Sequence, residues 1–157
     1  MLKTAKILAL ALLMLIGAAL ILGCSSSPSN PGGAQTTIRP GSKMPSSGLV
    51  QSSSEGSVDI DAKWLGERSN SLAFQIDMNT HSVELDQYDL SKLSILRDDA
   101  GKDYRPITWD SAPGGHHRGG TLVFPLPDSL RQQNAKYIEL VIRDVAGVKE
   151  RILRWRF

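Results

Sequence analysis

The sequence predicts an all-β domain built as a sandwich of about seven short strands. Apolar and polar residues alternate along segments of strand length, as in residues 57–65 and 72–78, and this period of two is typical of half-buried strands. Polar turns separate these segments, and no strong helical period lies between them. A small open β-barrel is the alternative, because the number of strands does not distinguish it from a sandwich.

The first four strands are expected in the front half of the domain. Residues 57–65 and 72–78 form the first two, and residues 93–97 form the third. The polar turn at residues 98–103 leads into the fourth strand at residues 104–109, in which Pro106 lies. Because proline has no backbone N–H, this fourth strand is expected at the edge of a sheet.

Three further strands follow a glycine-rich loop. They are expected at residues 121–124, 135–144 and 149–157, and the last two form a hairpin across residues 145–148. Residues 127–133 suit a short turn of helix. The arginines of the final strand are expected on a solvated face of the sheet: Arg151, Arg154 and Arg156.

Seven strands in two sheets resemble the broad immunoglobulin-like or fibronectin-like architecture, without the paired cysteines of antibody domains. The segments at residues 80–83 (Thr-His-Ser-Val) and 114–118 (Gly-Gly-His-His-Arg) also resemble uncharacterised exported bacterial proteins. That resemblance implies no known activity.

The N-terminus has the pattern of an export signal. Lys3 and Lys6 precede an apolar segment at residues 7–22, and residues 20–24 read Leu-Ile-Leu-Gly-Cys. This pattern resembles the signal of a bacterial lipoprotein, which implies that residues 1–23 are a cleaved signal peptide and that Cys24 carries lipid. An uncleaved membrane helix at residues 7–22 is the alternative, although it is slightly short for a bilayer core of about 30 Å.

Both alternatives attach the domain to a bacterial membrane on the extracytoplasmic side, and which membrane is left open. Residues 24–56 are rich in Ser, Pro, Gly, Thr and Gln. Such a composition cannot bury enough apolar surface to offset chain entropy, so a disordered linker is expected there. The β-sandwich domain is expected at residues 57–157.

Charge and cysteine content argue against nucleic-acid binding and against a fold held together by disulfides. The chain has 18 basic and 16 acidic residues, and Lys3 and Lys6 account for the excess, so no basic field remains to attract nucleic acid. Lipidation of Cys24 uses the only cysteine, which leaves no disulfide. The domain therefore depends on its apolar core.

The histidines are the candidate metal ligands. His81 follows the second expected strand, and His116 and His117 lie between the fourth and fifth. If each connection reverses the chain direction, both loops meet at one end of the sandwich. Three imidazoles with an open coordination position suit Cu(II), Zn(II) or Ni(II). Exposed loop histidines without a metal are the alternative, because the spacing alone is not specific.

Other polar residues near these loops are candidates for supporting roles. Carboxylates complete or orient a coordination sphere, and flat polar side chains suit a binding edge for a protein partner. Arg118 also suits a carboxylate clamp within the domain. The candidates are Asp77, Glu84, Asp86, Trp109, Asp110 and Arg118.

We therefore expect a lipid-anchored binding or interaction module of the cell envelope, without catalysis, with the histidine end as its candidate transition-metal site. A structural or protein-interaction module without a metal is the second hypothesis, with an envelope protein as partner. A hydrolase is the third and weakest hypothesis. Ser82, Ser111 and Ser129 supply hydroxyls, but no nucleophile-elbow sequence surrounds any of them.

Overall fold

The computed structural model describes residues 42–157. Cys24, the apolar segment at residues 7–22 and most of the predicted linker lie outside the described residues. Between residues 42 and 157, no helix is both long enough and apolar enough to cross a membrane.

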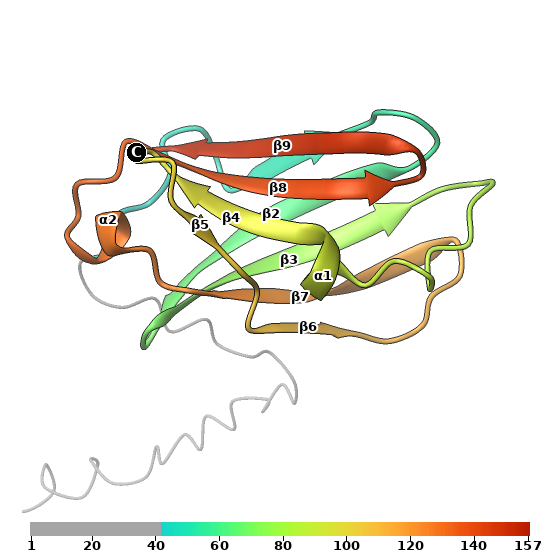
Figure 1. Ribbon diagram of the computed structural model, residues 1–157, viewed down its shortest axis with the longest axis horizontal. Coiled ribbons are helices and arrows are strands. Elements are labelled where there is room, and N and C mark those ends of the chain that lie inside the picture. The colour runs from blue at the N-terminus through green and yellow to red at the C-terminus, as the bar shows by residue number, and fades with distance from the viewer. Residues whose placement is uncertain (1–41) are drawn as a thin grey trace, which may run out of the picture. The chain divides into compact units, whose positions relative to one another are not determined.

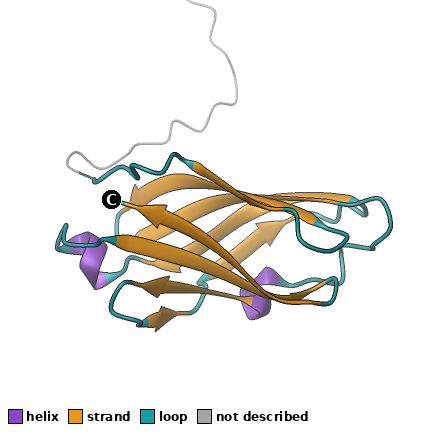
Figure 2. Cartoon of the chain, turned by 90° about the horizontal axis from the view of Figure 1, so that it is seen from above, coloured by secondary structure: helices purple, strands orange, loops and turns teal. Residues whose placement is uncertain are grey.

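Nine strands in the described part of the chain form two antiparallel sheets (Figure 1, Figure 2). The five-stranded sheet has the order β1 (Val50–Ser53), β2 (Asp59–Arg68), β3 (Ser71–Asn79), β7 (His117–Pro125), β6 (Thr108–Ser111). The four-stranded sheet has the order β5 (Asp103–Tyr104), β4 (Ser94–Asp98), β8 (Tyr137–Val145), β9 (Val148–Arg156). The sheets are separate and do not close into a barrel, so the all-β, two-sheet prediction is confirmed.

The core lies between the sheets because each strand turns its apolar residues inward. Along β2, Ile60, Ala62 and Trp64 are buried and the intervening side chains are exposed. The ring of Phe74 in β3 lies 5.4 Å from that of Trp64 and 4.8 Å from that of Trp155, between centroids. Burial of each such side chain stabilises the fold by roughly 1.5–3 kcal/mol.

The strand count differs from the predicted seven at two places. Strand β1 lies in the segment predicted as linker, and the expected strand at residues 104–109 is divided into β5 and β6. These two strands belong to different sheets. Pro106 lies between them, where it cannot donate a ladder hydrogen bond, so the chain leaves one sheet and joins the other.

The folded domain also begins earlier than residue 57. The Ser46 amide donates to the carbonyl of Arg156 at 2.7 Å, and the indole N–H of Trp155 donates to the carbonyl of Leu49 at 3.1 Å. Together with β1, these bonds attach residues 46–53 to the sandwich. The predicted linker at residues 24–56 therefore overlaps the domain.

Two short helices cap connections between strands. The expected helix at residues 127–133 is present as α2 (Asp128–Arg131), whereas α1 (Leu90–Leu93) was not expected. The Asp89 carboxylate accepts the Ser91 amide at 3.1 Å and so caps the first turn of α1. Helix α2 lies at the same end of the sandwich as the C-terminus (Figure 1).

Arg151 does not lie on the solvated face predicted for it. It points inward with Leu153 and Trp155 and has no exposed surface, whereas Arg154 and Arg156 are exposed. The Arg151 guanidinium donates to the carbonyls of Val145 at 2.9 Å and Glu55 at 2.7 Å. Burial lowers the pKa of Arg151, and the two carbonyls compensate part of the desolvation cost.

Candidate functional site

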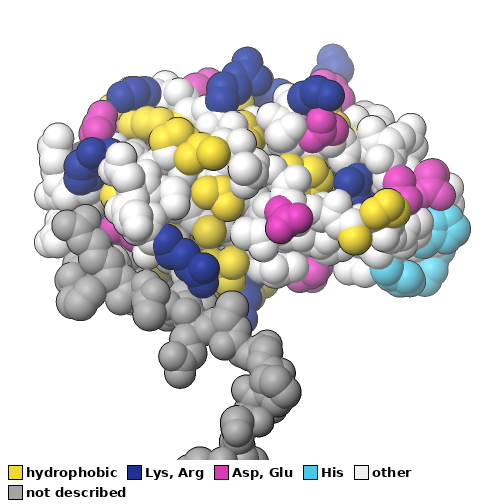
Figure 3. Space-filling view, turned by 90° about the horizontal axis from the view of Figure 1, so that it is seen from below, with side chains coloured by type: hydrophobic (Ala, Val, Ile, Leu, Met, Phe, Trp, Pro, Cys, Tyr) yellow, Lys and Arg dark blue, Asp and Glu magenta, His cyan; other side chains and the backbone are white. Residues whose placement is uncertain are grey.

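The two histidine-bearing loops meet at one end of the sandwich, which we call the histidine end. The strand pairing places Asn79, the last residue of β3, opposite His117, the first residue of β7. The Thr80 amide donates to the carbonyl of His116 at 3.0 Å, so the backbones are bonded just before His81. In Figure 3 the histidine side chains gather at this end of the molecule.

All three histidines are exposed, and one of them is oriented by a neighbour. Nδ1 of His117 lies 2.9 Å from Oδ1 of Asn79. With the amide oxygen as acceptor, Nδ1 is the donor of this bond, and the neutral form of the ring that makes it has the lone pair on Nε2.

The histidines are not arranged as a finished metal centre. Across residues 42–157, no group of three or more His, Cys, Asp or Glu side chains is positioned to hold a metal ion. The two predicted supporting carboxylates in the β3–α1 connection have backbone partners instead. Glu84 accepts the Asp86 amide at 3.3 Å, and Asp86 accepts the Gly114 amide at 2.8 Å.

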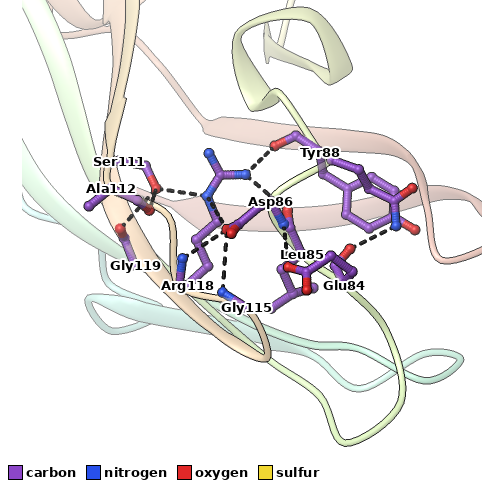
Figure 4. Close-up of polar contacts among 11 residues, drawn as sticks. Glu84, Leu85, Asp86, Tyr88, Ser111, Ala112, Gly115, Arg118 and Gly119 are labelled. Carbon is purple, nitrogen blue, oxygen red and sulfur yellow. Dashed lines mark hydrogen bonds and ion pairs between the residues drawn. The ribbon is translucent and has the colours of Figure 1, made fainter.

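The Arg118 side chain connects the loop after β3 with the loop between β6 and β7 through hydrogen bonds (Figure 4). Its Nη1 donates to the carbonyls of Leu85 at 2.9 Å and Tyr88 at 2.8 Å, and its Nε donates to the hydroxyl of Ser111 at 3.0 Å. The side chain is only 10% exposed, and its Nε lies 3.8 Å from Oδ1 of Asp86. Arg118 therefore acts as the clamp within the domain rather than as a binding edge.

Asp86 fastens the turn that carries His116 and His117. Its Oδ1 accepts the amides of Gly114 at 2.8 Å and Gly115 at 3.4 Å (Figure 4). The turn closes through the His117 amide, which donates to the Gly114 carbonyl at 3.0 Å. A Cβ at Gly114 would lie 2.2 Å from the His117 carbonyl oxygen, so this tight turn requires glycine there.

Trp109 was predicted at the binding edge, but it packs against the core. It is partly buried on the inner side of β6, and the Arg118 guanidinium lies 5.7 Å from its ring centroid. The hydroxyl oxygen of Ser111 lies 3.1 Å from the carbonyl oxygens of both Ala112 and Gly119, to either of which its single proton can be donated, while it accepts from Arg118. These contacts give Trp109 and Ser111 a part in the clamp.

Asp77 and Asp110 lie elsewhere, on the outer face of the five-stranded sheet. Strand pairing places Asp61 directly opposite Asp77, while Asp59 pairs with Asn79, which in turn pairs with His117. The four exposed carboxylates of this surface, which we call the acidic face, belong to Asp59, Asp61, Asp77 and Asp110. The acidic face thus runs to the histidine end, and Lys63 is the basic residue on the same side of β2.

The acidic face leaves its carboxylates without cations. Within residues 42–157, none of the four forms an ion pair, although carboxylates elsewhere do so with Arg or Lys. Asp77 accepts only a neutral hydrogen bond from Gln75 at 3.3 Å, and Asp61 accepts one from Ser52. Like charges directly opposite each other on neighbouring strands are unfavourable, so Asp61 and Asp77 reduce the stability of the sheet.

Sequence reasoning identified Asp77 and Asp110 but missed Asp59 and Asp61. The alternating pattern showed that both residues are polar positions of a strand, but it did not show the pairing register that places Asp61 opposite Asp77.

Comparisons of the chain with protein-family models, with curated proteins and with solved structures found no match.

Proposed function

We propose that this protein is a lipid-anchored, extracytoplasmic interaction module, not an enzyme, that binds a cationic protein segment on its acidic face. The observation that carries the proposal is the set of four carboxylates on one sheet face that form no ion pair within residues 42–157. Lys and Arg side chains of a partner would neutralise them and relieve the repulsion between Asp61 and Asp77.

The histidine end extends this surface. His117 pairs through Asn79 with Asp59, so imidazole and carboxylate groups are continuous along one row across the strands. The clamp of Arg118 and Asp86 keeps the two loops in one arrangement, and a pre-organised surface loses less entropy when a partner binds.

The membrane anchor is the second part of the proposal. The basic, apolar and Leu-Ile-Leu-Gly-Cys segments of the N-terminus support export and lipidation of Cys24. A Cys24→Ser variant is expected to leave the membrane fraction of the producing bacterium, while the wild type stays in it after washing at high salt. Retention of the variant in the membrane would favour an uncleaved helix at residues 7–22.

We also propose that the sandwich is immunoglobulin-like. The order β2-β3-β7-β6 in one sheet and β5-β4-β8-β9 in the other corresponds to the order A-B-E-D and C′-C-F-G of that architecture. Strand β1 is then an additional strand beside the first.

Binding of an oligolysine peptide tests the function directly. Full-length protein in zwitterionic detergent is expected to bind the peptide, more weakly as salt rises. An Asp61→Asn, Asp77→Asn double variant should lose about 2- to 30-fold in affinity, because each exposed ion pair contributes about 0.2–1 kcal/mol. Glu150→Gln is the matched control, since Glu150 is paired with Arg143 on the other sheet. Equal affinity of the double variant and the wild type would contradict the proposal.

Binding of Cu(II) or Zn(II) is the second candidate function, and the orientation of His117 by Asn79 favours it. Such a site would need His81 and His116 to move toward His117 on binding. Titration with each metal should then give a site that His117→Ala abolishes and that Asn79→Ala weakens. Affinity no greater than that of a single exposed imidazole would contradict a metal site at the histidine end.

A further inference from the structure

Charge is distributed unevenly between the two ends of the described domain. At the histidine end, the connections and adjoining strand ends contain seven acidic and three basic residues; they are residues 54–59, 79–93, 111–118 and 144–150. At the opposite end, which we call the α2 end, the corresponding segments contain six basic and three acidic residues; they are residues 42–49, 66–71, 99–102, 125–136 and 156–157. All six basic residues are exposed, whereas the acidic residue Glu67 is buried. The α2 end is therefore the basic end of the domain.

The chain enters the domain at this basic end. Nζ of Lys43 donates to the carbonyl of Ala135, just after α2, at 3.3 Å, and lies 5.8 Å from the ring centroid of Phe157. The Arg156 amide donates to the hydroxyl of Ser47 at 3.1 Å. The predicted linker therefore joins the domain at the α2 end, whereas the acidic face runs to the histidine end.

Exposed apolar side chains gather in the same segment. Of the five large apolar residues that are exposed among residues 42–157, three lie in residues 44–50: Met44 is 44%, Leu49 38% and Val50 50% exposed. Strand pairing places the exposed Lys63 opposite Val50. We call these apolar residues and the cations beside them the entry patch: Lys43, Met44, Leu49, Val50, Lys63 and Arg156.

The cations of the entry patch are available to a ligand. Among the residues that the structure describes, none of the three cations forms an ion pair, and residues 43–50 contain no acidic residue. Exposed apolar side chains beside such cations match the interface of a bilayer, where apolar groups enter the headgroup region and cations contact lipid phosphates. A polyanion without apolar groups would leave the three apolar side chains of the patch exposed to water.

We propose that the entry patch contacts anionic phospholipids of the membrane in which Cys24 is anchored, and that this contact turns the histidine end away from the bilayer. The inference depends on the membrane anchor of the proposed function. From Cys24 to Ser42 the chain advances by 18 residues, which reach at most about 60 Å when fully extended. A short flexible linker gives an effective concentration in the millimolar range, so a weak contact is sufficient to orient the domain.

The contact is weak without the anchor. Each Lys or Arg near an anionic surface strengthens binding about fivefold, and salt screens this attraction. The contact therefore orients the domain, while the lipid retains it in the membrane. In this orientation the carboxylates of the acidic face lie away from the anionic lipid that would repel them, and they remain accessible to a cationic partner.

Full-length protein purified from bacterial membranes and reconstituted in lipid vesicles provides the test. A fluorescent amino acid replaces Asn70, in the exposed turn of the α2 end, or Ala112, in the exposed loop of the histidine end. The vesicles contain phosphatidylcholine alone or with phosphatidylglycerol, and their lipid headgroups carry a quencher. Quenching at position 70 is expected to rise when phosphatidylglycerol is present and to fall again as salt is added, whereas quenching at position 112 should not rise.

Charge variants assign the contact to the entry patch. Lys43→Gln together with Arg156→Gln should lower the ratio of docked to undocked protein about 5- to 30-fold. Lys149→Gln is the matched control, because Lys149 is an exposed lysine at the histidine end. It should leave quenching at position 70 unchanged.

Apolar variants test the second component of the contact. Met44→Ser together with Val50→Ser should also lower quenching at position 70, because less apolar surface leaves water when the patch meets the bilayer. Ile152→Ser is the matched control, since Ile152 is 51% exposed on the other sheet. The melting temperatures of all these variants should match that of the wild type, because the replaced side chains are exposed.

Three results would overturn the lipid contact in protein that floats with the vesicles: equal quenching at position 70 with and without phosphatidylglycerol, an equal rise at positions 70 and 112, or quenching that the patch variants leave unchanged. Each of these would leave the anchor of the proposed function standing. Protein that fails to float with the vesicles would contradict the anchor and the lipid contact together. None of these results bears on oligolysine binding, which is measured in detergent.

Discussion

The outer faces of the two sheets carry the same kinds of charged residue but use them differently. On the four-stranded sheet, strand pairing aligns Arg154, Glu139, Arg97 and Asp103 in one row of alternating sign. Nε of Arg154 donates to Glu139 at 2.7 Å, and Nε of Arg97 donates to Asp103 at 2.8 Å. We call this row the ion-pair row.

Among the residues that the structure describes, nothing compensates the acidic face of the five-stranded sheet in this way. Asp61 lies opposite Asp77 where the ion-pair row would place an arginine. On this comparison, the charges of the ion-pair row stabilise the fold, whereas the like charges of Asp61 and Asp77 oppose it. Sites that serve binding often reduce stability in this way.

The substitution with the largest expected effect on the unfolding free energy tests which side of the five-stranded sheet faces the core. A Cβ at Gly120 would lie 2.5 Å from the Asp110 carbonyl oxygen and 2.7 Å from the Trp109 ring, so Gly120→Ala should lower the unfolding free energy by about 1–3 kcal/mol. At Gly119 the nearest atom is the Asp77 carboxylate oxygen at 2.8 Å, on a side chain that moves easily. Gly119→Ala is therefore the milder control. Equal losses in urea unfolding would contradict the assignment of the two sides.

Removal of the central carboxylate should break the ion-pair row. Glu139 is 5% exposed and lies between Arg154 and Arg97. Glu139→Gln should cost about 1–2 kcal/mol, less than a fully buried pair because the Arg154 side chain is 41% exposed. Glu150→Gln, on an exposed pair, should cost less than about 0.5 kcal/mol in the same urea titration. A larger loss for Glu150→Gln would argue against the row as a stabilising unit.

Neutralisation on the acidic face should have the opposite sign. Asp61→Asn or Asp77→Asn removes a like-charge pair and should raise the unfolding free energy by about 0.2–1 kcal/mol. The double variant should gain little beyond either single variant, since one replacement already removes the repulsion. A loss of stability in both single variants would show that these carboxylates support the fold.

The smallest expected effect is the response to acid. The hydrogen bond from Arg97 lowers the pKa of Asp103, so the stabilisation is complete above the ordinary Asp pKa of about 3.9 and is lost as pH falls through the lower folded value. Because the pair is partly exposed, the loss should be a few tenths of a kcal/mol. Unfolding followed between about pH 5 and 2 should show a shallower decline in Asp103→Asn than in the wild type. The same slope in both would exclude this contribution.

Much of the fold was predictable because burial imposes a local pattern. The alternation in residues 57–65 and 72–78 predicted β2 and β3, and the two histidine loops were expected at one end because antiparallel strands reverse the chain. Strand β1 was missed because Leu49 and Val50 are isolated apolar residues among serines. Arg151 was placed outside because its inward position depends on the carbonyls of Glu55 and Val145, which the local pattern does not include.

The candidate site was harder to predict because it depends on pairing between strands distant in sequence. Asp61 and Asp77 become neighbours only through the register of β2 and β3. Arg118 contacts carbonyl groups of residues 85 and 88, about thirty positions away, and no side-chain pattern marks those carbonyls.

Photo-crosslinking in the producing bacterium tests the central claim that the acidic face is the interaction surface. A photo-reactive amino acid is placed at Thr121, on the acidic face, or at Ile152, which is 51% exposed on the other outer face. We predict a discrete crosslinked partner from Thr121 only, which disappears when Asp61→Asn and Asp77→Asn are added. Crosslinks from Ile152 alone, or a Thr121 product that persists in the charge variant, would contradict the account.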